Sequence, residues 1–240
     1  AGRWYVSVQV EEEVPDPKPA NKPAVGVDLG ITRLATLSDG TIHENPKALR
    51  RNLKKIKRLQ RQLSRKQKGS QNRQKATRKL ARAHARVANL RRNTLHQITS
   101  QLAKTKSVVV IEDLNVSGMM KNHHLAQAIA DVGFHEFRRQ LEYKGEWYGC
   151  EVVVVDRWYP SSKTCSVCET EMEAMPLHVR DWECPVCGTQ HDRDVNAAVN
   201  LMKYATASSA GSHACGERVR PAVSAVFIEA GTQHQISTQI

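Results

Sequence analysis

Four of the six cysteines fall into two pairs with the spacing of a metal site. Cys165 pairs with Cys168 and Cys184 with Cys187, and 15 residues lie between the two pairs. Each Cys-x-x-Cys pair can direct two thiolates at one ion, and four soft sulfur ligands suit tetrahedral Zn²⁺. A closed shell of four protein ligands leaves no open position for a substrate. The spacing therefore predicts a zinc ion with a structural role.

Three carboxylates form a second set that could bind hard divalent ions. Asp28 and Glu112 each end a predicted strand, and Asp194 begins a predicted helix. Taken singly, each could merely cap a turn or begin a loop. Taken together, carboxylates at neighbouring strand ends and on a helix packed across them can hold two Mg²⁺ or Mn²⁺ ions about 4 Å apart, and such a pair activates water to cleave a phosphodiester. Neighbouring acids could replace one member of the set: Asp113, Asp156 and Asp192.

The elements that must position these acids follow from the hydrophobic pattern. Residues 24–43 contain three short apolar runs with turns between them, which predicts an antiparallel meander. Residues 107–111 and 151–156 are continuous apolar runs typical of fully buried strands, and residues 125–147 between them are amphipathic with helical spacing. A last helix is predicted over residues 194–204. Buried strands joined by a helix indicate an α/β fold with a mixed sheet covered on both faces.

The positive charge is concentrated in one segment. Residues 46–106 hold 21 of the 36 Lys and Arg and none of the 24 Asp and Glu, so the rest of the chain has a net charge of −9. Apolar residues recur every three or four positions on either side of a break at Gly69, which predicts an antiparallel helical hairpin with an apolar seam. A solvated face is the alternative, but so long a cationic run repels itself unless a polyanion neutralises it. The segment therefore predicts nucleic acid as a partner.

Further contacts with nucleic acid are expected around the strand ends. Trp158 and Tyr159 could stack on bases or fill the core. Arg193 could neutralise a phosphate or form a surface ion pair. The cations of the hairpin should contact the backbone and not the bases. The predicted nucleic-acid-binding residues are Lys54, Lys55, Arg58, Arg61, Arg65, Arg78, Arg82, Arg157, Lys163 and Arg193.

Nothing in the sequence predicts a membrane protein. No stretch approaches the roughly 20 apolar residues of a membrane helix, and the start has no signal-peptide pattern. We therefore expect a cytoplasmic protein, in which cysteines bind metal and do not form disulfides. Residues 3–10 alternate like a strand of an upstream β domain, and residues 11–23, rich in Pro and Lys, predict a linker.

Four stretches of the sequence resemble the TnpB family of transposon-encoded RNA-guided endonucleases, which are relatives of type V CRISPR effector nucleases. They are VGVDLG at residues 25–30, IEDLN at 111–115, YPSSKTCSVC at 159–168 and HDRDVNAA at 191–198. The resemblance extends over residues 24–204. It implies an RNase H-like (RuvC) fold with an inserted basic helical hairpin and an inserted zinc ribbon, in which Asp28, Glu112 and Asp194 are the catalytic acids.

The same resemblance implies a guide RNA and a DNA target as partners. The zinc ribbon would lie beside the nuclease site, and the hairpin would lie against the guide–target duplex. The family's N-terminal wedge and recognition domains are not found in this sequence, and residues 3–10 resemble the last strand of the wedge. We therefore expect the nuclease portion of such a protein.

The predicted domain order is an upstream β element with its linker (residues 1–22), a nuclease core (23–159) containing the hairpin (46–106), the zinc ribbon (160–190), a last helix (191–206) and a flexible tail (207–240). The predicted function is Mg²⁺-dependent DNA cleavage guided by bound RNA. One alternative is a transposon-derived protein that binds nucleic acid without cleaving it. A structure-selective resolvase is another, and the ribbon before the last helix argues against it.

Overall fold

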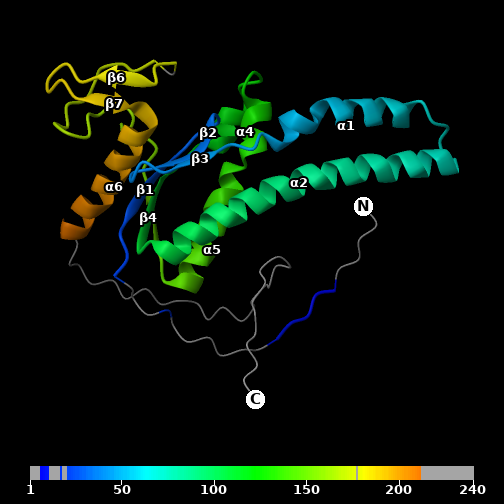
Figure 1. Cartoon of the computed structure of the whole chain (residues 1–240), viewed down its shortest axis with the longest axis horizontal. Helices are drawn as coiled ribbons and strands as arrows, with labels where there is room; N and C mark the ends of the chain where they lie inside the picture. The colour runs from blue at the N-terminus through cyan, green and yellow to red at the C-terminus, as the bar shows by residue number, and fades with distance from the viewer. Residues whose placement is uncertain (1–5, 11–16, 18–20, 177, 212–240) are drawn as a thin grey trace. The chain divides into compact units, whose positions relative to one another are not determined.

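The structure is a computed structural model that describes residues 6–10, 17, 21–176 and 178–211. From Pro17 to the last helix the chain forms one compact unit, whose centre is a five-stranded sheet in the order β3-β2-β1-β4-β5 (Figure 1). The strands of this sheet are β1 Val25–Leu29, β2 Arg33–Leu37, β3 Ile42–Glu44, β4 Val108–Glu112 and β5 Glu151–Val155. The helices are α1 Ala48–Ser64, α2 Gln71–Thr105, α3 Val116–Met120, α4 Ala126–Val132, α5 Phe134–Tyr148 and α6 Arg193–Gly211.

The sheet is mixed, as the sequence predicts. β1, β2 and β3 form an antiparallel meander, whereas β4 runs parallel to β1 and β5 runs parallel to β4. Parallel neighbours require crossover connections, and helices supply them here. The chain therefore has the predicted α/β class.

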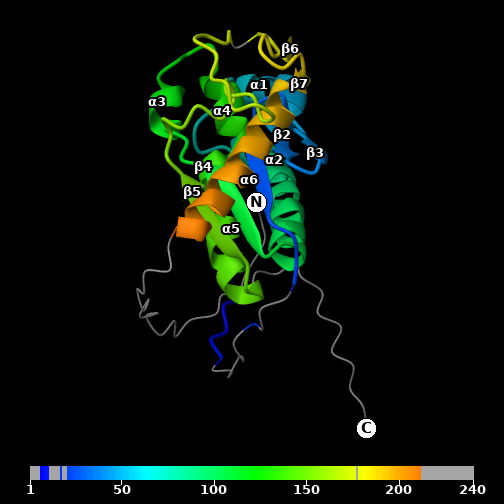
Figure 2. The same cartoon turned by 90° about the vertical axis from the view of Figure 1, so that its left-hand side faces the viewer.

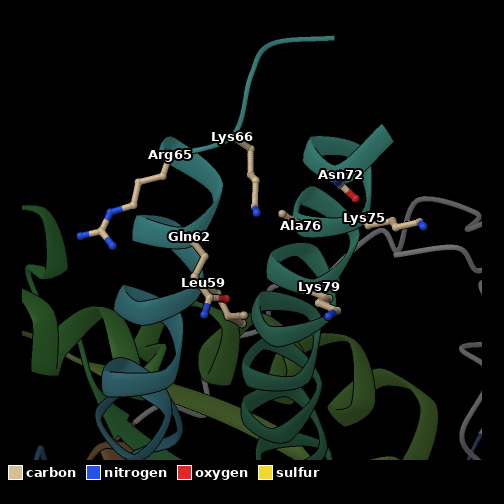
Figure 3. Close-up of a pocket in the computed structure, with 8 residues that line it drawn as sticks. All are labelled: Leu59, Gln62, Arg65, Lys66, Asn72, Lys75, Ala76 and Lys79. Atoms are coloured by element: carbon tan, nitrogen blue, oxygen red, sulfur yellow. The ribbon is translucent and has the colours of Figure 1, made fainter. Parts of the chain in front are cut away.

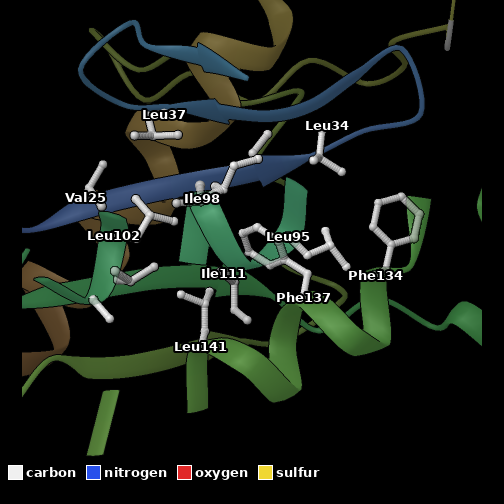
Figure 4. Close-up of a cluster of buried hydrophobic side chains, with 14 of the residues drawn as sticks. Val25, Leu34, Leu37, Leu95, Ile98, Leu102, Ile111, Phe134, Phe137 and Leu141 are labelled. Atoms are coloured by element: carbon white, nitrogen blue, oxygen red, sulfur yellow. The ribbon is translucent and has the colours of Figure 1, made fainter. Parts of the chain in front are cut away.

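The main core lies between the sheet and helices α2 and α5 (Figure 4). Val27 and Ile111 point into this core, and because strand side chains alternate, Gly26 and Val110 face the opposite side. There Val110 packs with Leu201 of α6, and Figure 2 shows α6 crossing the sheet in front of β1 and β4. The largest fully buried side chains of the main core include Leu34, Leu95, Leu102, Ile129, Phe137 and Leu141.

The basic hairpin is formed by α1 and α2, but α2 also belongs to the core. Its first half packs Ala83 and Val87 against Ile56 of α1. Its second half places Leu95 and Leu102 in the main core. The predicted insertion at residues 46–106 is therefore continuous with the core through one long helix.

Asp131, buried at the end of α4, fixes the base of the hairpin. Its carboxylate accepts hydrogen bonds from the N–H groups of Leu49 (2.9 Å) and Arg50 (3.2 Å) in the first turn of α1. Arg91 of α2 donates to the same carboxylate at 3.3 Å. A carboxylate at a helix start satisfies unpaired N–H groups and complements the helix dipole, so both hairpin helices are tied to the body.

The prediction of a single helix over residues 125–147 is wrong. The chain forms α4 and α5 instead, and the break falls at Gly133, which has a positive φ of 79°. The apolar spacing continues across the break, so the pattern alone did not reveal it. A glycine in the left-handed region ends one helix while leaving the next free to start in a new direction.

The ends of the chain differ from the prediction where they are described. Val6–Val10 is exposed and forms no strand, and within the described residues no strand pairs with it to satisfy its backbone groups. The rest of the predicted upstream strand, most of the linker and the tail beyond residue 211 lie outside the described residues. The last helix runs to Gly211, farther than the predicted end at residue 206. Among the described helices, none is both long and apolar enough to span a bilayer.

Candidate active site and metal centre

The four paired cysteines converge on one point. Their sulfur atoms all lie within 4.8 Å of one another. The Sγ atoms of Cys165 and Cys187 are 3.7 Å apart, and those of Cys168 and Cys184 are 3.5 Å apart. Zinc–sulfur bonds of about 2.3 Å in a tetrahedron give a sulfur–sulfur separation of about 3.8 Å. The cluster therefore fits a metal ion such as zinc.

The two Cys-x-x-Cys turns share the same backbone geometry and hydrogen bonding. The residues that follow the turns, Glu169 and Gly188, have positive φ angles of 62° and 66°. The N–H of the first cysteine in each turn donates to the carbonyl of Thr170 or Thr189 at 2.9 Å. The Thr170 hydroxyl lies 3.3 Å from Sγ of Cys168 and is the largest cause that lowers the pKa of that thiol to about 6. Lowering the pKa favours the thiolate, which is the form that binds metal.

The second Cys-x-x-Cys turn connects the two strands of a short antiparallel hairpin, β6 Asp181–Glu183 and β7 Gln190–Asp192. His191 of β7 is buried, and its Nε2 lies 3.1 Å from Sγ of Cys165. Its ring packs at 4.6 Å from the ring of Trp182 in β6. The hairpin that touches the cluster therefore leads directly into the first turn of α6.

Asp28 and Glu112 occupy adjacent positions on the α6 face of the sheet. β1 and β4 are parallel with Val27 opposite Ile111, and Asp28 and Glu112 are the next residue of each strand. Neighbouring strands lie about 4.8 Å apart, and successive side chains point to opposite faces. Both carboxylates therefore point away from the main core, at the carboxyl ends of their strands.

Asp194 reaches the same edge because α6 packs directly on β1. A Cβ atom on Gly26 would lie 1.9 Å from the carbonyl oxygen of Ala198 and 2.7 Å from the backbone nitrogen of Met202. Only glycine allows the helix backbone this close to the strand. Asp194 lies one helical turn before Ala198, and Asp28 lies two residues beyond Gly26 along β1. The close contact therefore brings the helix start to the strand end.

The three carboxylates interact electrostatically. Burial, followed by the negative charges of Asp194 and Glu112, raises the pKa of Asp28 to about 7, although Arg193 and Arg180 act in the opposite direction. The pKa of Glu112 is also raised, mainly by burial. Within the described part of the chain, only the four cysteines bring three or more ligand atoms within 4.8 Å of one another. The three carboxylates are thus not as close together as the four cysteine ligands, but Asp194 and Glu112 are near enough to Asp28 to repel its negative charge, and a bound cation stabilises such a group.

Two arginines that sequence reasoning missed contact Asp194. Nη1 of Arg180, just before β6, donates to Oδ1 of Asp194 at 2.7 Å. Nη1 of Arg33, the first residue of β2, lies 3.7 Å from Oδ2 of Asp194 and donates to Oδ2 of Asp192 at 2.7 Å. A lone arginine at or just before a strand start looks like an ordinary surface cation, so neither residue could be recognised from the sequence.

Two of the alternative acids have other partners. Asp113 forms ion pairs with Arg138 at 2.9 Å and with Arg157, and the hydrogen bond from Arg157 is the largest cause that lowers its pKa. Asp156 is exposed, and its Oδ1 accepts the backbone N–H of Trp158 at 2.8 Å. The geometry therefore favours Asp28 and Glu112 over these neighbours as members of the carboxylate site.

The predicted contacts on the hairpin are all exposed. They are Lys54, Lys55, Arg58, Arg61, Arg65, Arg78 and Arg82. Near the tip of the hairpin, an open groove of about 540 Å³ lies between α1 and α2 (Figure 3). The positively charged residues that line it are Arg65, Lys66, Lys75 and Lys79. Figure 3 shows Lys66 directed between the helices, while Arg65 and Lys75 point outwards. The hairpin thus presents a continuous cationic surface.

The three predicted contacts outside the hairpin have partners within the chain. Arg157 is held by Asp113, as described above. Lys163 lies 2.6 Å from Oε1 of Glu171. Arg193 donates to the carbonyl of Pro176 at 3.3 Å. Each of these side chains is therefore already engaged within the chain, and a bound phosphate would share its N–H donors with the existing partner or displace that partner.

The two aromatic candidates differ. Tyr159 packs edge-to-face on Tyr204 with ring centroids 5.0 Å apart, and its hydroxyl lies 3.4 Å from the carbonyl of Asn200. Trp158 is 84% exposed. Of these two side chains, only the indole of Trp158 is therefore available for stacking on a base.

Comparison with known families and curated proteins agrees with the motifs. The family model OrfB_IS605, described as "Probable transposase", matches residues 7–123, and the model "Cas12f1-like, TNB domain" matches residues 134–201. A protein of Streptomyces pristinaespiralis named "Putative RNA-guided DNA endonuclease" is 50% identical over 221 residues, which cover 92% of this chain and 54% of the relative. The "TnpB-like protein L79" of Acanthamoeba polyphaga mimivirus is 32% identical over 126 residues, 50% of this chain and 24% of its own. The chain is a relative of these TnpB-like proteins.

The relationship extends to a second bacterial protein. "Putative RNA-guided DNA endonuclease InsQ" of Escherichia coli (strain K12) is 41% identical over 234 residues, which cover 91% of this chain and 57% of the relative. The family resemblance drawn from the motifs is thus confirmed. The chain spans about half the length of these two curated relatives, 54% of the first and 57% of the second.

Two solved structures share the fold. The protein in "Cryo-EM structure of the Cas12f1-sgRNA-target DNA complex" matches with a TM-score of 0.52 and 20% identity, over 80% of this chain and 51% of that one. The protein in "Cryo-EM structure of CRISPR-Cas12f Ternary Complex" matches with a TM-score of 0.53 and 20% identity, over 82% and 41%. At this identity the likeness shows the fold alone.

Proposed function

We propose that this TnpB-like chain is the nuclease portion of an RNA-guided DNA endonuclease with an RNase H-like (RuvC) active site. The observation that carries the proposal is geometric: Asp28 and Glu112 end adjacent parallel strands, and the close contact of Gly26 with Ala198 packs α6, whose first turn holds Asp194, on the same strand. Burial and the charges of Asp194 and Glu112, which raise the pKa of Asp28, agree with this arrangement. In the proposed site, these three acids from three elements would meet at the carboxyl ends of the parallel strands β1 and β4, on the face covered by α6. In open α/β sheets this is the edge at which ligands bind.

Asp28, Glu112 and Asp194 would hold divalent ions, because hard carboxylate oxygens are the ligands that Mg²⁺ and Mn²⁺ prefer. Bound there, a pair of such ions would supply an activated water and would stabilise the leaving oxygen of a phosphodiester. Arg180, which hydrogen-bonds Asp194, would be available to neutralise the scissile phosphate once Asp194 binds a cation.

The cysteine cluster would hold a structural Zn²⁺. Its four ligands leave no position for substrate, so the ion would stabilise the turns and the β6–β7 hairpin and would take no part in cleavage. Because β7 leads into α6, this metal would also support the start of the helix that carries Asp194.

The exposed cations of α1 and α2 would bind the phosphate backbone of a guide RNA and its DNA target. Cations along a helix face carry no sequence code, so base pairing with the guide would supply specificity and the protein would recognise duplex shape and charge. The absence of any acid among residues 46–106 supports a polyanionic partner for this surface.

A cleavage assay tests the proposal. The zinc-loaded chain is incubated with end-labelled single-stranded DNA in Mg²⁺ or in Mg²⁺-free buffer, beside Asp28→Ala, Glu112→Ala and Asp194→Ala. Asp156→Ala serves as the matched control, because Asp156 directly follows the neighbouring strand β5 and its carboxylate caps the N–H of Trp158. We expect Mg²⁺-dependent cleavage that only the first three substitutions abolish. Equal cleavage by the wild type and Asp28→Ala would overturn the assignment.

A second measurement separates cutting from binding. RNA that copurifies with the chain is quantified after washing at moderate salt, with and without substitution of hairpin cations. Bound RNA that is lost on substitution supports the guided enzyme. A wild type that binds nucleic acid but never cleaves it would favour the binding protein without cleavage activity.

A further inference from the structure

Asp192 makes three hydrogen bonds where the ribbon joins α6. Its Oδ1 accepts the backbone N–H groups of Asp194 and Val195, each at 3.0 Å. Its Oδ2 accepts Nη1 of Arg33 at 2.7 Å. Asp192 is therefore the N-cap of α6, and both of its oxygens are engaged within the protein. This arrangement argues against Asp192 as an alternative metal ligand.

Arg33 links this cap to the sheet. It is the first residue of β2, and β2 pairs with β1, the strand that carries Asp28. Its guanidinium lies 2.7 Å from Asp192 and 3.7 Å from Asp194. The Asp194 side chain is only 13% exposed. One arginine at the start of β2 therefore restrains both the helix cap and the carboxylate two residues later.

We propose that Arg33 and Asp192 are positioning residues that orient Asp194 and so strengthen divalent-metal binding at the carboxylate site. The proposal rests on the proposed function, because it takes Asp194 as a metal ligand. Asp192 fixes the backbone of the first turn of α6, and Arg33 fixes Asp192 and limits where the Asp194 carboxylate can turn. A ligand held in place before the ion arrives binds it more tightly than one that must first be ordered.

The test measures metal binding directly. Binding of Mn²⁺ to the zinc-loaded full chain is titrated by electron paramagnetic resonance of the free ion. Asp192→Ala and Arg33→Ala should raise the Kd for Mn²⁺ by roughly 10- to 100-fold. Asp192→Asn keeps an oxygen that can cap the helix and loses the ion pair, so its effect should be smaller. Arg33→Lys should recover part of the affinity.

Two controls keep the result interpretable. Arg139→Ala removes a comparable ion pair on α5, 2.8 Å from Glu136, and should leave the Kd unchanged. Circular dichroism melts establish that each variant is folded at the titration temperature. Asp194→Ala should abolish the binding that the positioning residues strengthen.

The outcomes separate the two proposals. If Asp194→Ala loses Mn²⁺ binding while folded Asp192→Ala and Arg33→Ala bind like the wild type, the positioning role is wrong and the proposed function stands. If Asp194→Ala binds Mn²⁺ as tightly as the wild type, the proposed function fails and the positioning role fails with it.

Discussion

The two candidate metal sites of this chain are assembled in opposite ways. The cysteine site is built from two short turns of the same local geometry, and its four sulfurs already lie within 4.8 Å of one another. The carboxylate site draws Asp28, Glu112 and Asp194 from two strands and a helix, and its position depends on how α6 packs on β1. The geometry of the cysteine site is therefore set by its own short turns. The carboxylate site can form only after the sheet has formed and α6 has packed on it.

The two sites also differ in what shifts the pKa values of their ligands. In the cysteine site, the hydrogen bond with Thr170 lowers the pKa of Cys168 to about 6, whereas burial raises the pKa of Cys165 to about 11. In the carboxylate site, burial and two nearby acids raise the pKa of Asp28 to about 7. At neutral pH, cation binding to the carboxylates should therefore release protons, since each ligand must be ionised to bind.

Loss of a cysteine ligand should give the largest effect. Cys184→Ser should lose bound zinc and unfold the ribbon, because structural zinc sites supply on the order of 10 kcal/mol of binding free energy to the folded state. Zinc content per chain and circular dichroism melts measure this. Cys150→Ala, outside the cluster and at the start of β5, is the control and should retain about one zinc ion per chain. Retention of zinc by Cys184→Ser would contradict a four-sulfur site.

Gly26→Ala should disturb the carboxylate site only by changing how α6 packs on β1. The new methyl group would lie 1.9 Å from the carbonyl oxygen of Ala198, so α6 must move away from β1. We expect a loss of about 3 kcal/mol in unfolding free energy, the upper end of overpacking costs. Urea denaturation measures the loss. Gly40→Asn, in a turn with open space and a positive φ that Asn tolerates, should change stability by less than about 1 kcal/mol.

The contrast between the sites also explains which features the sequence could predict. The cysteine turns are readable because their spacing is local. The pairing of Asp28 with Glu112 follows from the tendency of buried parallel strands to end at one edge. The contacts of Arg33 and Arg180 with Asp194 depend on tertiary packing, so the spacing of these residues in the sequence does not predict them.

The helix break at Gly133 escaped prediction for another reason. Its φ of 79° is set by the change of direction between α4 and α5, while the apolar pattern runs on without interruption. Periodicity reports which face of a helix is buried and carries little information on where one helix ends and the next begins. The same limit applies to α2, whose double role in hairpin and core lies within one uninterrupted pattern.

Asp28→Asn should remove the pH dependence of stability that the buried Asp28 carboxyl creates. The folded-state pKa of about 7 lies above the ordinary value of 3.8, so the folded chain binds the proton more tightly and stability falls as pH rises from about 4 to 7. Asparagine cannot ionise, so the variant should match the wild type near pH 4. At pH 7.5 without Mg²⁺ it should be more stable by about 2 kcal/mol, after allowance for partial exposure of the site.

Urea denaturation of the zinc-loaded protein at both pH values measures this difference. Addition of Mg²⁺ at pH 7.5 should stabilise the wild type and leave Asp28→Asn unchanged, because only the wild type has the full set of carboxylates. A wild type whose stability does not change between pH 4 and 7.5 relative to Asp28→Asn would show that burial and the nearby acids do not raise the pKa of Asp28.

Neutralising the hairpin should give the smallest effect per residue and should leave both metal sites intact. Lys54→Ala, Arg58→Ala and Arg61→Ala remove exposed cations of α1. The slope of log affinity for RNA against log salt should decrease by up to about 0.9 for each lost phosphate contact. Binding titrations at several salt concentrations measure the slope, and Arg139→Ala on α5 is the control. An unchanged slope in the triple variant would place the nucleic acid on another surface.

Anomalous diffraction shows whether Asp28, Glu112 and Asp194 share divalent ions. Crystals of the zinc-loaded chain are soaked in Mn²⁺, and anomalous maps are recorded at the manganese and zinc edges. We expect zinc at the four cysteines and two manganese peaks about 4 Å apart among the three carboxylates. Zinc at the cysteines with no manganese in contact with Asp28 or Glu112 would show that the carboxylates do not form the proposed metal site.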